Sequence, residues 1–328
     1  MNIGFFVRHF TERGTEVAIY DYAKYNEEIL GNKSYIICFT QSSSMQKSIG
    51  PVERCSYDKF NTRFQIIEIQ HISDMSTIIQ NYNFSFFYTL TSGGNDVYEF
   101  NNKMIWGNCK TIKHCVFDTT CKESDFYISI ADVLNTKYKT QYPVIPHIVE
   151  LPNYNDHLRN ELHIPETATV FGRYGGYSEF NIKEVHHAIK EYIDTDENCY
   201  FLFMNTQPFH IHPRIIYLEK TIDLLYKTKF INTCDAMIHA RLMGETFGLS
   251  IAEFSIKNKP IITSMCGDLE HINILKGNAI IYHSIEDLLH IFKNIQTIIK
   301  SKQNWNSYTK YTPEYVMHLF KTYIFDKA

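Results

Sequence analysis

A repeated rhythm of short apolar runs and helix-like stretches constrains the fold of this chain more than any other feature. In the first half, the helix-like stretches include positions 15–30 and 74–80. The apolar runs lie at positions 3–7, 35–39, 65–69, 86–90, 111–117 and 126–130. This alternation is typical of a parallel sheet whose strands are joined by crossover helices. We therefore predict an α/β fold.

Three prolines, Pro143, Pro146 and Pro152, interrupt the rhythm before it starts again. The second half is then expected to form strands at positions 169–173, 200–204, 214–218, 236–239, 260–263 and 279–282. Helices are expected at 182–193, 221–230, 249–256 and 285–299. A chain of 328 residues is too long for one ordinary domain and fits two. We predict a first domain, a second domain and a C-terminal helix over residues 1–150, 151–310 and 311–328.

Composition and charge exclude several classes of protein. The formal charge of −4 and the pI near 6.4 lack the basic surplus of a sequence-independent nucleic-acid binder. The eight cysteines include no C-x-x-C pair, so we expect reduced core thiols and no zinc site. Neither a signal-peptide pattern nor a long apolar run occurs, which predicts a cytoplasmic protein without a transmembrane segment. A peripheral membrane contact stays open, although no basic amphipathic helix argues for one.

The segment from Glu245 to Glu253 carries the clearest chemical signal. Gly248 has no Cβ, so the backbone can approach a ligand closely there, and Leu249 and Ala252 mark the buried face of a helix that begins near Gly248. The first amides of a helix lack intrahelical partners and carry the positive end of its dipole, so they can hold a diphosphate. The segment therefore predicts a phosphate site made of backbone.

The two glutamates suit the groups on either side of such a diphosphate. Glu253 lies four residues after Leu249, about 6 Å along the helix axis, which is the reach to ribose hydroxyls. Glu245 precedes the glycine turn, on the far side of the phosphates, where a sugar would lie. Taken alone, a solvated Glu253 and a helix-capping Glu245 would be the simpler interpretation. With their neighbours they predict a nucleotide-sugar site.

Further residues extend this pattern. They are Arg173 upstream and, downstream, positions 260–263, Gly267 with Glu270, positions 277–282 and positions 285–288. In order and spacing, positions 245–288 resemble the C-terminal half of GT-B retaining glycosyltransferases of family four, the group 1 glycosyl transferases. The resemblance is thin over the N-terminal half.

The resemblance implies a GT-B fold, in which two Rossmann-like domains face each other across a cleft. The N-terminal domain would hold the acceptor, the C-terminal domain would hold the donor, and the last helix would cross back to the N-terminal domain. The implied reaction transfers a sugar from a UDP- or GDP-linked donor to a glycan, a lipid or another acceptor, with retention of the anomeric configuration. It implies no cofactor, no dedicated metal and no nucleic-acid partner.

The resemblance also implies roles for single residues. Arg173 would stabilise the leaving diphosphate, and Glu245 and His114 would position the sugar. Glu253 would bind the ribose. Further donor contacts would come from the surrounding loops, at Phe247, Gly248, Leu249, Arg241, His239, Gly175, Gly176 and Gly14.

One residue departs from the family pattern. The family usually has a lysine six residues after the arginine, as a second contact to the diphosphate, whereas this chain has Glu179. The backbone amides of Gly175 and Gly176 would replace the lysine contact if they form an anion-binding nest. Arg241, in the loop that leads to Glu245, is another candidate replacement.

Two positions of the N-terminal half keep a simpler alternative. His114 lies near the end of a candidate strand, where a histidine is often just packed. Gly14 lies in a loop without the G-x-G-x-x-G turn of a nicotinamide dehydrogenase, and an ordinary loop glycine explains it about as well.

No metal site is predicted. Residues 194–196 have the D-x-D form used by glycosyltransferases of the GT-A architecture, but acids are expected in a turn between a helix and a strand. The histidines at 186–187 and 210–212 have no third ligand at a fixed spacing.

Two rival functions stay open on the sequence. The missing lysine gives some weight to a non-catalytic protein that binds nucleotide sugars. A GT-B nucleotide-sugar 2-epimerase would share the fold and would change the sugar without any acceptor.

Overall fold

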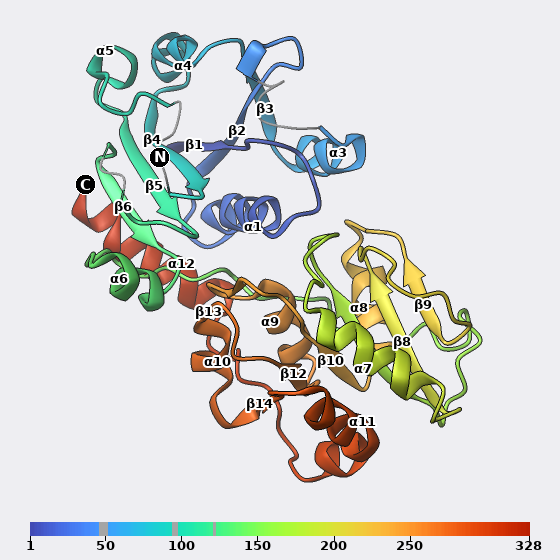
Figure 1. The fold of residues 1–328 in the computed structure, drawn as a ribbon. Helices are drawn as coiled ribbons and strands as arrows, with labels where there is room; N and C mark the ends of the chain where they lie inside the picture. The colour runs from blue at the N-terminus through green and yellow to red at the C-terminus, as the bar shows by residue number, and fades with distance from the viewer. Residues whose placement is uncertain (46–51, 94–97, 121–122) are drawn as a thin grey trace. The chain divides into compact units, whose positions relative to one another are not determined.

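The computed structural model describes residues 1–45, 52–93, 98–120 and 123–328. Contacts within the chain divide it into two compact units, Met1–Ile148 with Tyr311–Ala328 (unit 1) and Val149–Lys310 (unit 2). Each unit has a six-stranded sheet with helices packed around it, and every described strand pair in both sheets is parallel (Figure 1). The predicted α/β class is therefore confirmed.

The sheet of unit 1 has the order β3-β2-β1-β4-β5-β6. Its strands are β1 Asn2–Phe6, β2 Lys33–Phe39, β3 Gln65–Ile69, β4 Phe84–Thr91, β5 Lys110–Cys115 and β6 Phe126–Ser129. Its helices are α1 Gly14–Glu28, α3 Arg54–Arg63, α4 Met75–Tyr82, α5 Lys103–Trp106, α6 Asp132–Tyr138 and the 3₁₀ turn η1 Ile72–Asp74. This is the strand order of a Rossmann fold. Strand β4 is buried on almost every residue, as a central parallel strand covered on both faces must be.

Unit 2 repeats the same topology, because its order β14-β12-β10-β7-β8-β9 also places the first strand beside the fourth. Its strands are β7 Thr169–Tyr174, β8 Cys199–Met204, β9 Ile215–Leu218, β10 Ala236–Ile238, β12 Ile261–Thr263 and β14 Ala279–Ile281, with a small separate pair of β11 Gly244–Glu245 and β13 Asp268–Leu269. Its helices are α7 Lys183–Ile193, α8 Leu224–Thr233, α9 Leu249–Ile256, α10 Glu270–Leu275, α11 Ile285–Lys300 and the 3₁₀ turn η2 Lys276–Asn278.

Amphipathic spacing and capping residues explain where the helices lie. Leu288, Ile291, Phe292 and Ile295 form the buried stripe of α11 at helical spacing. Helix α8 begins three residues later than the sequence pattern suggested, because the Asp223 side chain caps it by accepting from the second and third amides.

The last helix, α12 Pro313–Tyr323, packs against α1 within unit 1 and is followed by the 3₁₀ turn η3 Phe325–Lys327 (Figure 1). Thr312 caps α12, and Pro313 occupies its first turn, where a missing amide proton costs nothing. The Phe320 ring packs against both Tyr22 and Tyr88, with its centroid 5.5 Å from that of each tyrosine. The C-terminal segment thus completes the core of unit 1.

The cysteines are free thiols in the described part of the chain. Five are buried: Cys38, Cys109, Cys115, Cys199 and Cys234. Cys55 is exposed, Cys266 is half-buried, and Cys121 lies outside the described residues. Among the described helices, none combines the length and the apolar character that crossing a bilayer requires.

We expect Phe320→Ala to lower the free energy of unfolding of unit 1 by about 3–5 kcal/mol, because it leaves a cavity beside two buried tyrosine rings. Urea denaturation measures the loss. The matched control is His318→Ala on the exposed face of the same helix, which should cost less than about 0.5 kcal/mol. Equal losses in both variants would show that α12 does not depend on this packing.

Candidate functional site

Several predicted site residues of unit 2 lie at the switch point of its sheet. Strands β7 and β10 pair in the middle of the sheet, and the chain continues from β7 to one side and from β10 to the other. Ligands of open parallel sheets bind beyond the carboxyl ends of the strands at such a point. The loop after β7 carries Glu179, and the loop after β10 carries His239, Arg241 and Glu245. Glu179 and the residues of the second loop, which are far apart in the sequence, thus meet at the carboxyl edge of the sheet.

Glu245 is held by a partner on each carboxylate oxygen. His239 Nε2 lies 3.2 Å from Oε1, and Arg241 Nη1 donates to Oε2 at 2.9 Å. Behind His239, its Nδ1 lies 3.0 Å from the Thr263 hydroxyl, and that hydroxyl lies 3.1 Å from His271 Nε2. This buried relay fixes the orientation of the Glu245 carboxylate. His271 and Thr263 are the members that the sequence analysis missed.

The charges around Glu245 keep it ionised. Burial acts to raise the pKa of Glu245, but the hydrogen bond from His239 and the charge of Arg241 act against it, and this pKa lies below its ordinary value. Burial and the neighbouring His239 lower the pKa of His271 to about 3, so His271 is neutral at physiological pH. The site therefore presents a carboxylate anion that is paired with the Arg241 guanidinium, with the neutral His271 further back.

Arg241 bridges two carboxylates. Its Nη2 donates to Glu179 Oε1 at 2.9 Å, while its Nη1 binds Glu245. Its Nε is buried and has no hydrogen-bond partner among the described residues. The arginine that was expected to supply positive charge is thus paired with the acid that stands at the family's lysine position.

Arg173 is buried at the end of β7 and is bound to the backbone of two loops. Its Nη1 donates to the Thr206 hydroxyl at 2.6 Å and to the Asn205 carbonyl at 3.2 Å, and its Nη2 donates to the Gly176 carbonyl at 2.9 Å. Burial lowers the pKa of Arg173 to about 10, so the guanidinium stays charged at neutral pH. Arg173 therefore brings a fixed positive charge to the switch point.

The carbonyls of Gly175 and Gly176 take part in local hydrogen bonds. The Gly176 carbonyl accepts from Arg173, and the Gly175 carbonyl accepts from the Asn205 side-chain amide at 2.8 Å. Neither glycine has a positive φ. An anion contact of their backbone N–H groups stays a prediction. A Cβ at Gly175 would come within 2.9 Å of Arg173 Nη2. At Gly175 the lack of a side chain thus makes room for the guanidinium.

Gly248 makes the turn into α9. Its φ of 79° lies in the left-handed region, and a Cβ there would meet the Glu245 side chain at 3.3 Å. No side chain caps α9, and the first residues of the helix, Leu249 and Ser250, are half-buried. Phe247 is buried, and its carbonyl accepts from the Tyr308 hydroxyl at 2.8 Å. The contact with Tyr308 thus anchors the loop at Phe247. The amides at the start of α9 have no side-chain cap.

Glu253 lies apart from this cluster, within a buried ion pair. Lys227 on α8 approaches its two carboxylate oxygens at 2.9 and 3.3 Å, and both side chains are almost fully buried. Lys227 was not predicted from the sequence. A lysine on the same buried face of α8 as Phe230 and Ile231 is the pattern that indicates a buried partner. A ribose contact of Glu253 stays a prediction.

Of the two predicted residues of unit 1, one lies in its core and the other begins its first helix. His114 on β5 is fully buried, and its Nδ1 lies 2.9 Å from the Tyr88 hydroxyl. Burial, together with nearby His147, holds the pKa of His114 well below its ordinary value. His114 is thus a packed core histidine in this structure, as the simpler alternative expected. A contact with the donor sugar stays a prediction. Gly14 is the first residue of α1.

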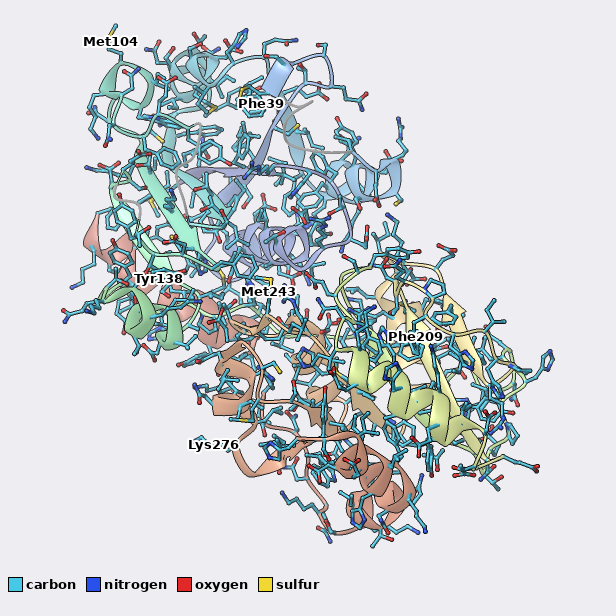
Figure 2. All side chains as sticks on the ribbon, in the orientation of Figure 1. Phe39, Met104, Tyr138, Phe209, Met243 and Lys276 are labelled. Carbon is cyan, nitrogen blue, oxygen red and sulfur yellow. The ribbon has the colours of Figure 1, made fainter. Side chains whose placement is uncertain are left out.

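The discounted metal motifs have structural roles. His186 donates from Nε2 to the Phe180 carbonyl at 2.8 Å and stacks on Phe209, which Figure 2 labels, with ring centroids 4.1 Å apart. Asp196 accepts from the Tyr192 hydroxyl at 3.0 Å. Within the described ranges, no group of three or more His, Cys, Asp or Glu side chains could hold a metal ion.

Comparisons with known proteins identify the fold. No protein-family model matches the sequence, and no curated protein matches it. Among solved structures, HepE from Anabaena in complex with UDP-glucose has a TM-score of 0.73 at 13% identity, over 100% of this chain and 99% of HepE. A glycosyltransferase from Rickettsia africae has a TM-score of 0.63 at 16% identity, over 98% of this chain and 93% of its own.

A protein assigned to another reaction class shares the fold. A Listeria monocytogenes protein assigned as UDP-N-acetylglucosamine 2-epimerase has a TM-score of 0.59 at 10% identity, over 97% of this chain and 94% of its own. The chain therefore has the GT-B fold of two Rossmann-like domains, and this prediction is confirmed. The fold hosts more than one reaction, so the site residues must carry the functional argument.

We expect the stabilising contribution of Glu245 to disappear in acid. Its pKa in the folded protein lies below the ordinary 4.5, so the ionised carboxylate adds stability above that value, and this stability is lost as the pH falls through the folded-state pKa. Urea denaturation should show a penalty for Glu245→Gln at pH 7 that shrinks at lower pH. Glu197→Gln, at an exposed position, is the control. A penalty that does not change with pH would contradict the assignment.

We expect Lys227→Met to cost about 3–5 kcal/mol of stability, because it leaves the Glu253 carboxylate buried without its cation. Replacing both residues, as Lys227→Met with Glu253→Leu, should restore much of the loss. A double-mutant cycle in urea measures the coupling. Additive losses would show that the two side chains act independently.

Proposed function

We propose that this protein is a glycosyltransferase that transfers a sugar from a nucleoside diphosphate to an acceptor. The observation that carries the proposal is the loop after β10. It joins Glu245, oriented by His239 and Arg241, to the left-handed Gly248 and the uncapped start of α9. A diphosphate at those amides would place its sugar on the Glu245 side. The GT-B fold and the UDP-glucose bound by HepE support the same choice of donor.

The proposed chemistry is departure of the diphosphate from the anomeric carbon. The acceptor oxygen forms the new bond to that carbon, the bond to the phosphate oxygen breaks, and the phosphate receives the acceptor's proton. Arg173 and the amides of α9 would stabilise the charge that grows on the leaving group, and preorganised donors of this kind usually contribute the largest catalytic term. Glu245 would hold the sugar hydroxyls.

Several finer features belong to the same proposal. The sequence resemblance supports retention of the anomeric configuration and a diphosphate held without a dedicated metal. The donor would be UDP- or GDP-linked, and the acceptor would be a glycan, a lipid or another compound. Free buried thiols suit a cytoplasmic location, because that compartment keeps cysteines reduced.

A binding screen and a product analysis test the proposal against its rivals. A donor at about a hundred times its dissociation constant should add about 2.7 kcal/mol of stability, which a thermal shift detects. UDP-glucose is the first donor to try, because HepE binds it. In NMR without acceptor, a changed sugar would favour the 2-epimerase, which the Listeria structure brings into the comparison. Binding without turnover for any acceptor would favour a non-catalytic protein.

We expect Arg173→Ala to lower turnover by roughly a hundredfold if Arg173 stabilises the leaving group, as loss of one such donor typically does. The readout is UDP release from UDP-glucose. Because Arg173 also binds two loops, the melting temperature of the variant must be measured, and rates are compared only below its unfolding transition. A folded variant with the wild-type rate would remove Arg173 from the site.

A further inference from the structure

Glu179 and Arg241 form an ion pair between the loops that follow β7 and β10. Arg241 Nη2 donates to Glu179 at 2.9 Å, and Nη1 donates to Glu245 at 2.9 Å. The exposed fractions of the side chains are 13% for Arg241, 15% for Glu245 and 41% for Glu179. One guanidinium is thus clamped by an enclosed carboxylate and by one that reaches solvent.

The loop after β7 is built to hold Glu179 in this place. The Glu179 amide donates to the Gly176 carbonyl at 3.0 Å, which closes a tight turn. A Cβ at residue 176 would lie 2.5 Å from Cδ of Glu179. The side chain therefore folds back over a glycine, and the same carbonyl that closes the turn also accepts from Arg173.

The charges of this cluster are matched. Glu179 is the largest of the charges that oppose the burial-driven lowering of the Arg173 pKa, so Glu179 lies close to both arginines. A carboxylate alone beside a diphosphate would repel it, but the charge of Glu179 is compensated by Arg241. A cation at residue 179 would instead face Arg241 with like charge.

We propose that Glu179 is a positioning residue, which holds Arg241 as a second cationic contact for the diphosphate of the donor. The inference rests on the proposed function. Two carboxylates fix the planar guanidinium in one orientation, whereas Glu245 alone would leave a long side chain free to turn. Each Nη group of Arg241 carries two protons and makes one hydrogen bond within the described residues, so each keeps an N–H for a ligand. In this proposal, Arg241 in the loop after β10 supplies the positive charge that a lysine at position 179 would otherwise supply.

The test is Glu179→Lys, because it separates two opposite expectations. If Glu179 positions Arg241, the lysine should lower the affinity for inorganic pyrophosphate and for UDP by roughly tenfold or more, since a charged hydrogen bond is lost and a like charge is added. If Glu179 only weakens the site by its own charge, the lysine should raise both affinities. Isothermal titration measures them, and a rise would overturn the proposal.

The matched control is Glu184→Lys, at an exposed position in the first turn of α7. It makes the same charge change without touching Arg241, so the affinities should stay within about twofold at physiological salt. An equal loss in this control would overturn the proposal, because the effect would then be one of net charge.

A second pair of variants covers the case in which Glu179→Lys does not fold. Glu179→Gln keeps an oxygen that accepts from Arg241 and should retain most of the pyrophosphate affinity, whereas Glu179→Ala should lose it. Equal affinities in these two variants would overturn the positioning role. Wild-type protein that binds neither UDP nor UDP-glucose would instead end the proposed function itself, so the two failures are distinguishable.

Discussion

The bridge that Arg241 forms between Glu179 and Glu245 is the interaction on which the candidate site depends. Three charged groups gather at the edge of a parallel sheet, and partly buried charges persist only when they are paired. The relay through His239 and Thr263 to His271 supports Glu245 from the other side. The carboxylate that faces the proposed sugar thus has a fixed charge and a fixed direction before any donor arrives.

The repeated strand order explains why the charges gather there. In unit 2 the chain leaves β7 and β10 in opposite directions, so their two loops are the ones that can meet beyond the sheet. One loop contributes Glu179, and the other contributes Arg241, Glu245 and the turn at Gly248. The fold is shared by transferases and by a protein assigned as an epimerase, so the fold provides this edge, and the side chains decide its chemistry.

The features that could be predicted from the sequence are those that depend on residues close together in the chain. Apolar runs located the strands of both sheets, and the loop that joins Arg241 to Gly248 was readable because its residues are close in sequence. The pair of β11 and β13 was not, since it consists of two residues on each side and depends on left-handed Gly244 and Gly267. The Lys227 pair with Glu253 joins two helices, and no spacing within one helix reports such a contact. The Gly175 carbonyl likewise accepts from Asn205, 30 residues further along the chain.

The central claim is that the diphosphate of a nucleotide sugar docks on the uncapped amides that open α9. Amide NMR of the protein during a titration with UDP-glucose tests it most directly, because each backbone N–H reports its own surroundings. The account predicts that the amides of Gly248, Leu249 and Ser250 shift most and saturate together with the side-chain signals of Arg241. Saturable binding that leaves these amides unchanged, with the largest shifts elsewhere in the chain, would contradict it.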